Sequence, residues 1–88
     1  MTETALLKIK NLGMEPLSLD IEPFPDQYTI QPKSSVEIVT ELSPRAKTKA
    51  YLVHWYPDGL VLFPPDSEDS WNGTKVFCEG KLLEPSKP

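Results

Sequence analysis

The stretch Tyr51–Phe63 reads YLVHWYPDGLVLF and has the densest apolar and aromatic content of the chain. Two runs rich in β-branched, aromatic and leucine residues flank Pro57-Asp58-Gly59, a sequence typical of a tight turn. The pattern predicts a β-hairpin that is closed by a positive φ at Gly59.

The first strand of this hairpin is apolar on both of its faces. On an extended strand, Leu52, His54 and Tyr56 share one face. Val53 and Trp55 share the opposite face. We therefore expect either a central strand that the rest of the chain covers on both sides, or a strand whose second face meets a partner.

The sequence outside the hairpin consists of short runs, most of them alternating between apolar and polar residues, with turn signals between them. Strands are expected at 5–10, 17–22, 28–30, 36–40 and 74–78, with a short edge strand at 81–83. About seven short strands in one small chain predict an all-β fold. We expect a single domain over residues 1–88 with a frayed tail at 84–88, built as a small antiparallel β-sandwich. A partly open β-barrel is the alternative.

Composition restricts the class of partner and the cellular location. The net charge of −4 disfavours nucleic acid, because such binding depends on clustered Lys and Arg that neutralise phosphates. The N-terminus lacks the basic and apolar regions of a secretory leader, and no apolar run approaches the ~20 residues of a membrane span. The single cysteine, Cys78, excludes an intramolecular disulfide. We expect a cytoplasmic protein with no nucleic-acid or membrane partner.

Two segments resemble a class of short bacterial proteins. The run N-L-G-M-E-P-L-S-L-D-I-E-P begins at Asn11, and the run Y-T-I-Q-P-K-S-S-V-E-I-V begins at Tyr28. In that class, an Asn-Gly turn leads to E-P-L-x-L-x-x-E-P, and a P-x-x-x-V-x-V turn and strand follow. The resemblance implies an all-β sandwich of the immunoglobulin-like or cupredoxin-like kind. It implies no activity, because a fold does not determine a function.

The Cys and His content argues against copper and zinc sites and gives little support to thiol catalysis. A blue-copper site needs two His and one Cys, and a closed zinc site needs four Cys and His ligands. The chain has one residue of each type, Cys78 and His54. Cys78 ends an apolar, strand-like run, which predicts a buried structural cysteine rather than a catalytic thiol.

The acidic run Asp66, Glu68 and Asp69 has oxygen ligands of the type that calcium prefers. Its spacing does not match an EF-hand loop, which needs ligands at alternate positions and a glutamate at the end. A solvated acidic loop is therefore the preferred interpretation, and we expect no metal and no cofactor.

The aromatic residues divide between the core and the surface. Trp55 and Phe63 are expected in the core, because a small domain needs large apolar side chains there. Trp71 follows a polar run and precedes a turn signal, so we expect it to be exposed. The candidate binding residues are His54, Tyr56 and Trp71, with a packed, hydrogen-bonded His54 as the preferred alternative to a ligand-binding one.

Together these patterns predict a non-enzymatic protein-binding or accessory module. It would present a sheet face, an edge strand or loops to a protein partner or to a second copy of itself. The alternative is a carbohydrate or small-ligand binding module that uses Trp71, Tyr56 and the acidic loop. An enzyme would require Cys78 or His54 to meet a carboxylate in an open pocket.

Overall fold

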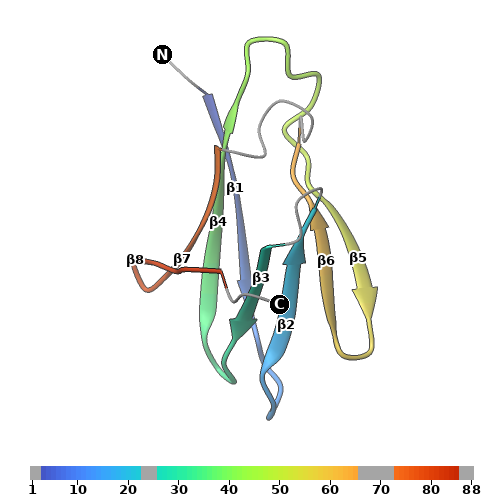
Figure 1. Cartoon of the computed structure of the whole chain (residues 1–88), viewed down its shortest axis with the longest axis vertical. Helices are drawn as coiled ribbons and strands as arrows, with labels where there is room; N and C mark the ends of the chain where they lie inside the picture. The colour runs from blue at the N-terminus through green and yellow to red at the C-terminus, as the bar shows by residue number, and fades with distance from the viewer. Residues whose placement is uncertain (1–2, 23–25, 66–72, 86–88) are drawn as a thin grey trace.

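The computed structural model describes residues 3–22, 26–65 and 73–85. Its eight strands form two four-stranded sheets that lie face to face, which confirms the predicted β-sandwich (Figure 1). The strands are β1 (Glu3–Lys10), β2 (Leu17–Ile21), β3 (Asp26–Ile30), β4 (Ser35–Leu42), β5 (Leu52–Tyr56), β6 (Gly59–Phe63), β7 (Thr74–Cys78) and β8 (Lys81–Leu82). The expected acidic loop at 66–69, Trp71 and most of the tail at 84–88 lie outside the described residues.

The two sheets have different pairing patterns. The first has the order β1-β4-β7-β8 and is antiparallel throughout. The second has the order β3-β2-β6-β5, in which β2 and β6 run parallel. The parallel pairing of β2 with β6 differs from the fully antiparallel sandwich that was expected. It arises because the chain leaves the second sheet after β3, forms β4 in the first sheet and then returns to the second sheet. The returning hairpin places β6 beside β2 and leaves β5 at the edge.

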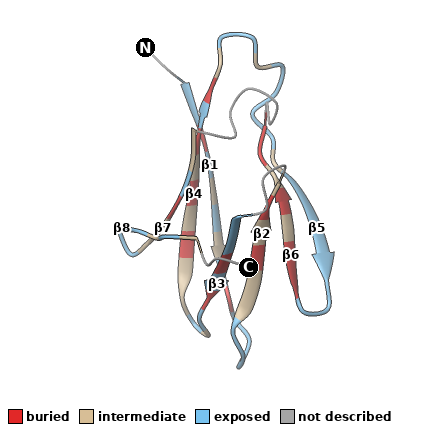
Figure 2. Ribbon diagram, in the orientation of Figure 1, coloured by how far each residue is buried: buried red, intermediate tan, exposed pale blue. Residues whose placement is uncertain are grey.

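The core lies between the sheets and is formed by alternate residues of the inner strands, together with Tyr28 and Ile30 of the edge strand β3. Leu19, Ile38, Leu62 and Val76 have no solvent exposure, and one comes from each of β2, β4, β6 and β7. Each fully buried aliphatic side chain of this kind contributes roughly 1.5–3 kcal/mol. Figure 2 shows buried segments on β4 and β6, whereas β5 is exposed over its whole length.

Tyr51, directly before β5 of the second sheet, forms hydrogen bonds with two strands of the first sheet. Its hydroxyl oxygen lies 2.9 Å from the carbonyl oxygen of Ala5 and 2.8 Å from Oγ1 of Thr40. Thr40 is fully buried and its Oγ1 also lies 3.1 Å from Oγ1 of Thr74. These hydrogen bonds hold the start of β5 against the first sheet.

Asn11 holds the loop between β1 and β2. It is buried, and its side-chain amide donates hydrogen bonds to the carbonyl oxygens of Glu15 at 2.8 Å and Ile30 at 2.9 Å. Its Oδ1 accepts a hydrogen bond from the Gly13 amide at 2.9 Å. These bonds hold the bend between β1 and β2, and the buried one gives the carbonyl oxygen of Ile30 a hydrogen-bond partner.

The hairpin of β5 and β6 is present, but the role of Gly59 in it differs from the one predicted. Gly59 has no positive φ, so the prediction on this point is wrong. Pro57 and Asp58 form the turn, with proline at its second position, as type I turns prefer. Glycine is required because a Cβ at position 59 would lie 2.7 Å from the carbonyl oxygen of Ser18 on β2. The close approach of two parallel strands therefore explains this glycine.

No helix in residues 3–22, 26–65 or 73–85 has the length and apolar character needed to cross a membrane.

Candidate functional site

Strand β5 carries four of the eight large hydrophobic residues that are exposed in the described fold. All five of its residues, Leu52, Val53, His54, Trp55 and Tyr56, are exposed. Trp55 is 80% exposed, the highest value among them, and Leu52 is 56% exposed. A strand that is apolar on both faces and yet exposed is unusual in a small domain, because apolar area is normally buried first.

The register with β6 shows which side chains face the sandwich interior. Val53 and Trp55 lie opposite Leu62 and Leu60, which are both core residues. Val53 and Trp55 therefore belong to the inner face of their sheet, yet both are exposed. The opposing sheet does not cover this end of the inner face, and the sandwich is open there.

The outer face of the same hairpin carries a second apolar group. Leu52, His54 and Tyr56 lie opposite Phe63, Val61 and Gly59, respectively. The rings of His54 and Phe63 are 5.0 Å apart between centroids, tilted by 58°. The exposed apolar surface thus wraps around the edge of the sheet from the inner to the outer face.

The other edges of the two sheets carry features that discourage pairing with a foreign strand. β1 exposes Lys8 and Lys10, β3 begins at Asp26, and β8 has only two residues. β5 contains no Lys, Arg, Asp, Glu or Pro. Among the described edges, β5 is therefore the one best suited to accept another strand.

Two residues of β5, His54 and Tyr56, were predicted from the sequence as binding residues. The positions predicted for other residues of the hairpin differ from those in the structure. His54 and Tyr56 lie on the same face of β5, as predicted. The core position predicted for Trp55 is wrong, and Phe63 is half-buried on the outer face rather than in the core. The central, covered position expected for this strand is also wrong, because strand order places β5 at the edge. Trp71, the third candidate, lies outside the described residues.

His54 and Cys78 do not form a common site. Cys78 ends β7 in the first sheet and packs, half-buried, against the core. His54 lies on the outer face of the second sheet, and the core separates the two residues. Within the described part of the chain, no three His, Cys, Asp or Glu side chains gather closely enough to hold a metal ion.

Two surface hollows lie away from the inner face of β5. One of about 160 Å³ is formed by the outer face of the second sheet, where Tyr56 meets Asp20, Gln27 and Asp58. It is smaller than the roughly 300–1,000 Å³ of common ligand pockets.

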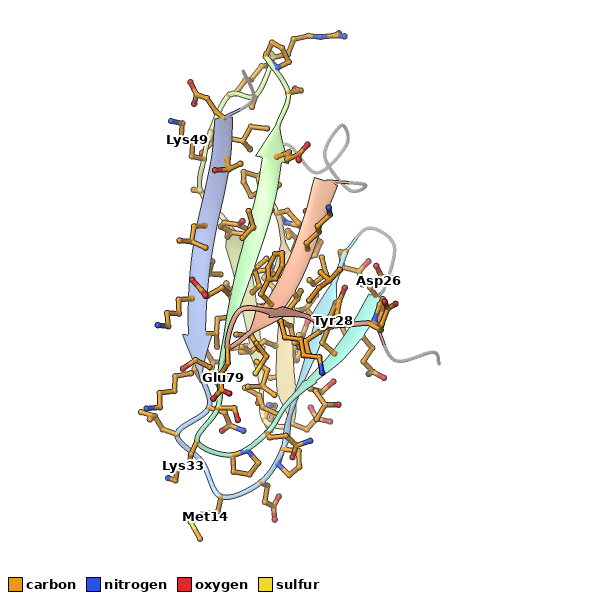
Figure 3. The ribbon with its side chains drawn as sticks, turned by 90° about the vertical axis from the view of Figure 1, so that its left-hand side faces the viewer. Met14, Asp26, Tyr28, Lys33, Lys49 and Glu79 are labelled. Atoms are coloured by element: carbon orange, nitrogen blue, oxygen red, sulfur yellow. The ribbon has the colours of Figure 1, made fainter. Side chains whose placement is uncertain are left out.

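The other hollow, of about 520 Å³, lies between the start of β1 and the loop 43–49. An exposed ion pair borders it, in which Nζ of Lys49 lies 2.7 Å from Oε2 of Glu3 (Figure 3). Through its hydrogen bond and its charge, Lys49 lowers the pKa of the Glu3 carboxyl.

Comparisons of the chain with protein-family models, curated proteins and solved structures give no match.

Proposed function

We propose that this protein is a non-enzymatic protein-binding module whose docking element is the free edge of β5. The observation that carries the proposal is an edge strand that lacks charge and proline and is exposed on both apolar faces. A partner strand added to such an edge gains backbone hydrogen bonds, and alternate side chains supply specificity.

The backbone geometry supports strand addition. A two-residue hairpin turn begins its ladder with a hydrogen-bonded pair, here Tyr56 with Gly59. Alternate residues then direct their N–H and C=O groups to opposite sides of the strand. We therefore expect the backbone groups of Val53 and Trp55 to point toward the free edge, where an added strand would bond to them.

Site-specific photo-crosslinking tests this function. A photoreactive amino acid in place of Trp55, in the protein expressed in its own cells, should give a covalent adduct with a protein chain. The adduct should disappear when Val53→Lys is added, because lysine on an edge discourages strand addition. The matched control places the same group at Leu6, which is 62% exposed on the edge strand β1 of the other sheet. Adducts at both positions alike, or at neither, would contradict the proposal.

A small-ligand site around Tyr56 is a second candidate. Tyr56 is 48% exposed and borders the hollow that also contains Asp20, Gln27 and Asp58. An aromatic face beside polar groups is suited to stacking on a sugar ring. A glycan array would test this: binding that is lost in Tyr56→Ala and kept in Val53→Lys would favour the ligand site over strand addition.

A further inference from the structure

We infer that the partner of β5 is a second copy of this chain, paired antiparallel about a two-fold axis that passes between the two copies of His54. The inference rests on the proposed function, that β5 is a docking strand, and specifies its occupant. Three features carry it: the register of the strand, the charges at its two ends, and the charge of the whole chain.

The sequence of β5 is self-complementary in this register. Val53 lies opposite Trp55 of the second copy, and Leu52 lies opposite Tyr56 of the second copy. Each aromatic residue thus meets an aliphatic one, a cross-strand combination that stabilises antiparallel pairs. Because rotation about an axis perpendicular to the sheet preserves its faces, Val53 and Trp55 stay on the inner face in both copies.

Opposite charges at the two ends of β5 favour the antiparallel direction. The segment before the strand carries Lys47 and Lys49, and the turn after it carries Asp58. Lys49 already contacts Glu3, whereas Lys47 forms no ion pair with any other described residue. Antiparallel pairing brings the lysine-containing end of one copy to the Asp58 turn of the other. Parallel pairing would instead place like charges together.

The net charge limits where two copies can meet. Each chain carries −4, so two copies repel each other over much of their surfaces. The five residues of β5 contain no acidic or basic side chain other than His54, and they expose the apolar area that a contact would remove from water. One short strand is nevertheless a small contact compared with the ~800 Å² per partner of a standard interface. We expect a weak dimer that forms as concentration rises.

Sedimentation equilibrium of the full chain from about 1 µM to about 1 mM tests the dimer, because this range covers free energies of association from about −8 to −4 kcal/mol. The average mass should rise toward twice that of one chain. Val53→Lys should abolish the rise, and the matched variant Leu6→Lys on β1 should leave it unchanged. Both positions are exposed, so the variants should stay folded, which far-ultraviolet circular dichroism checks.

A charge exchange at His54 tests the axis itself. If the axis passes between the two copies of His54, these residues are direct neighbours across the pair of strands. His54→Asp and His54→Lys should then each weaken self-association by about tenfold or more, through like-charge repulsion. Mixing the two variants should restore association, because Asp and Lys then lie opposite each other. An interface elsewhere on the molecule would show no such recovery.

The outcomes separate this inference from the proposed function. A chain that remains monomeric while Trp55 still crosslinks to a different protein overturns the second copy as occupant and leaves the docking strand in place. A dimer that survives Val53→Lys, or that shows no recovery in the His54 mixture, also overturns the inference. A monomer with no β5-dependent crosslink overturns both proposals.

Discussion

At the scale of single residues, the buried Asn11 and the half-buried Tyr51 determine how the loops and sheets are joined. The side chain of Asn11 forms hydrogen bonds with three backbone groups. The hydroxyl of Tyr51 lies within hydrogen-bond distance of carbonyl oxygens on both β1 and β4. Neither role can be predicted from the order of apolar and polar residues in the sequence. Their importance arises because a buried backbone group without a partner costs about 1–3 kcal/mol.

Substitution of Asn11 should therefore destabilise the fold much more than substitution of its exposed neighbours. Asn11→Ala should lower the free energy of unfolding by about 1–3 kcal/mol, because the carbonyl oxygens of Glu15 and Ile30 lose their donor. Urea unfolding followed by tryptophan fluorescence measures the change. The control is Glu15→Ala, which removes an exposed side chain and keeps the backbone carbonyl. Equal losses in the two variants would contradict the role assigned to Asn11.

Two tyrosines, the buried Tyr28 and the half-buried Tyr51, should make stability fall at alkaline pH. Burial raises the pKa of Tyr51, although its hydrogen bond with Thr40 partly opposes the shift. Burial, with smaller contributions from Asp26 and Glu84, also raises the pKa of Tyr28 (Figure 3). The native state therefore holds these protons more tightly than the unfolded state, in which tyrosine has a pKa of about 10. Their stabilising effect is complete below that pH and is lost as pH rises through the raised native pKa values.

Urea unfolding at several alkaline pH values checks this expectation. Lysines titrate in the same range, so the informative quantity is the difference between wild type and Tyr51→Phe. The variant should be less stable at neutral pH and should lose stability less steeply as pH rises. Parallel curves for the two proteins would show that the Tyr51 hydroxyl does not contribute to the pH dependence.

At the scale of elements, the β5–β6 and β7–β8 hairpins each contain a glycine, and the two glycines are needed for different reasons. Gly80 follows Glu79 in the turn between β7 and β8, and both have positive φ, as a two-residue hairpin turn often requires. Gly59 has ordinary φ and is needed only because β2 lies so close. A sequence cannot separate these cases, since both read as glycine in a turn.

Substitution by asparagine should distinguish the two glycines. Gly80→Asn should change the free energy of unfolding by less than about 1 kcal/mol, because asparagine tolerates positive φ and the site is open. Gly59→Asn should cost about 1–3 kcal/mol or more, because its Cβ collides with the Ser18 backbone. Thermal and urea unfolding of both variants measure the difference. Similar losses would mean that the β2–β6 contact is looser than the structure shows.

The strands themselves were largely predictable from the sequence. The order in which they lie side by side in the two sheets was not. Alternation in 17–22 and 36–40 gave the strands around Leu19 and Ile38, because a strand with one buried face repeats every second residue. The doubly apolar run at 52–56 predicted either a covered central strand or a strand whose second face meets a partner, and the structure places it at an edge. The two situations share one pattern, since a pattern records which side chains are apolar and not what lies against them. Strand order depends on contacts between distant segments, such as Tyr51 with Ala5.

At the scale of the whole molecule, the sandwich is closed around β2, β3, β4, β6 and β7 and open at β5. The closed part contains the fully buried aliphatic residues, including Ile38 and Leu62. The open part keeps apolar area in contact with water, which a small domain does at a cost to its own stability. Local stability should therefore be uneven, with β5 at the low end.

Amide hydrogen exchange at low protein concentration should reveal this unevenness residue by residue. Amides in the middle of β4, around Ile38, should exchange slowly, because the strand has neighbours on both sides. Along β5 the rates should alternate. The Val53 and Trp55 amides should exchange fast because they point toward the free edge, and the His54 amide should be slower because it faces β6.

The same measurement at high concentration links this pattern to function. Occupation of the edge by another strand should slow the Val53 and Trp55 amides and leave the Ile38 amide unchanged. Val53→Lys serves as the control, because its edge should remain open at every concentration. Protection of the Trp55 amide in the dilute wild-type protein would show that the free edge of β5 is already covered. In that case the exposed apolar strand would have a structural role within the chain rather than a role in binding.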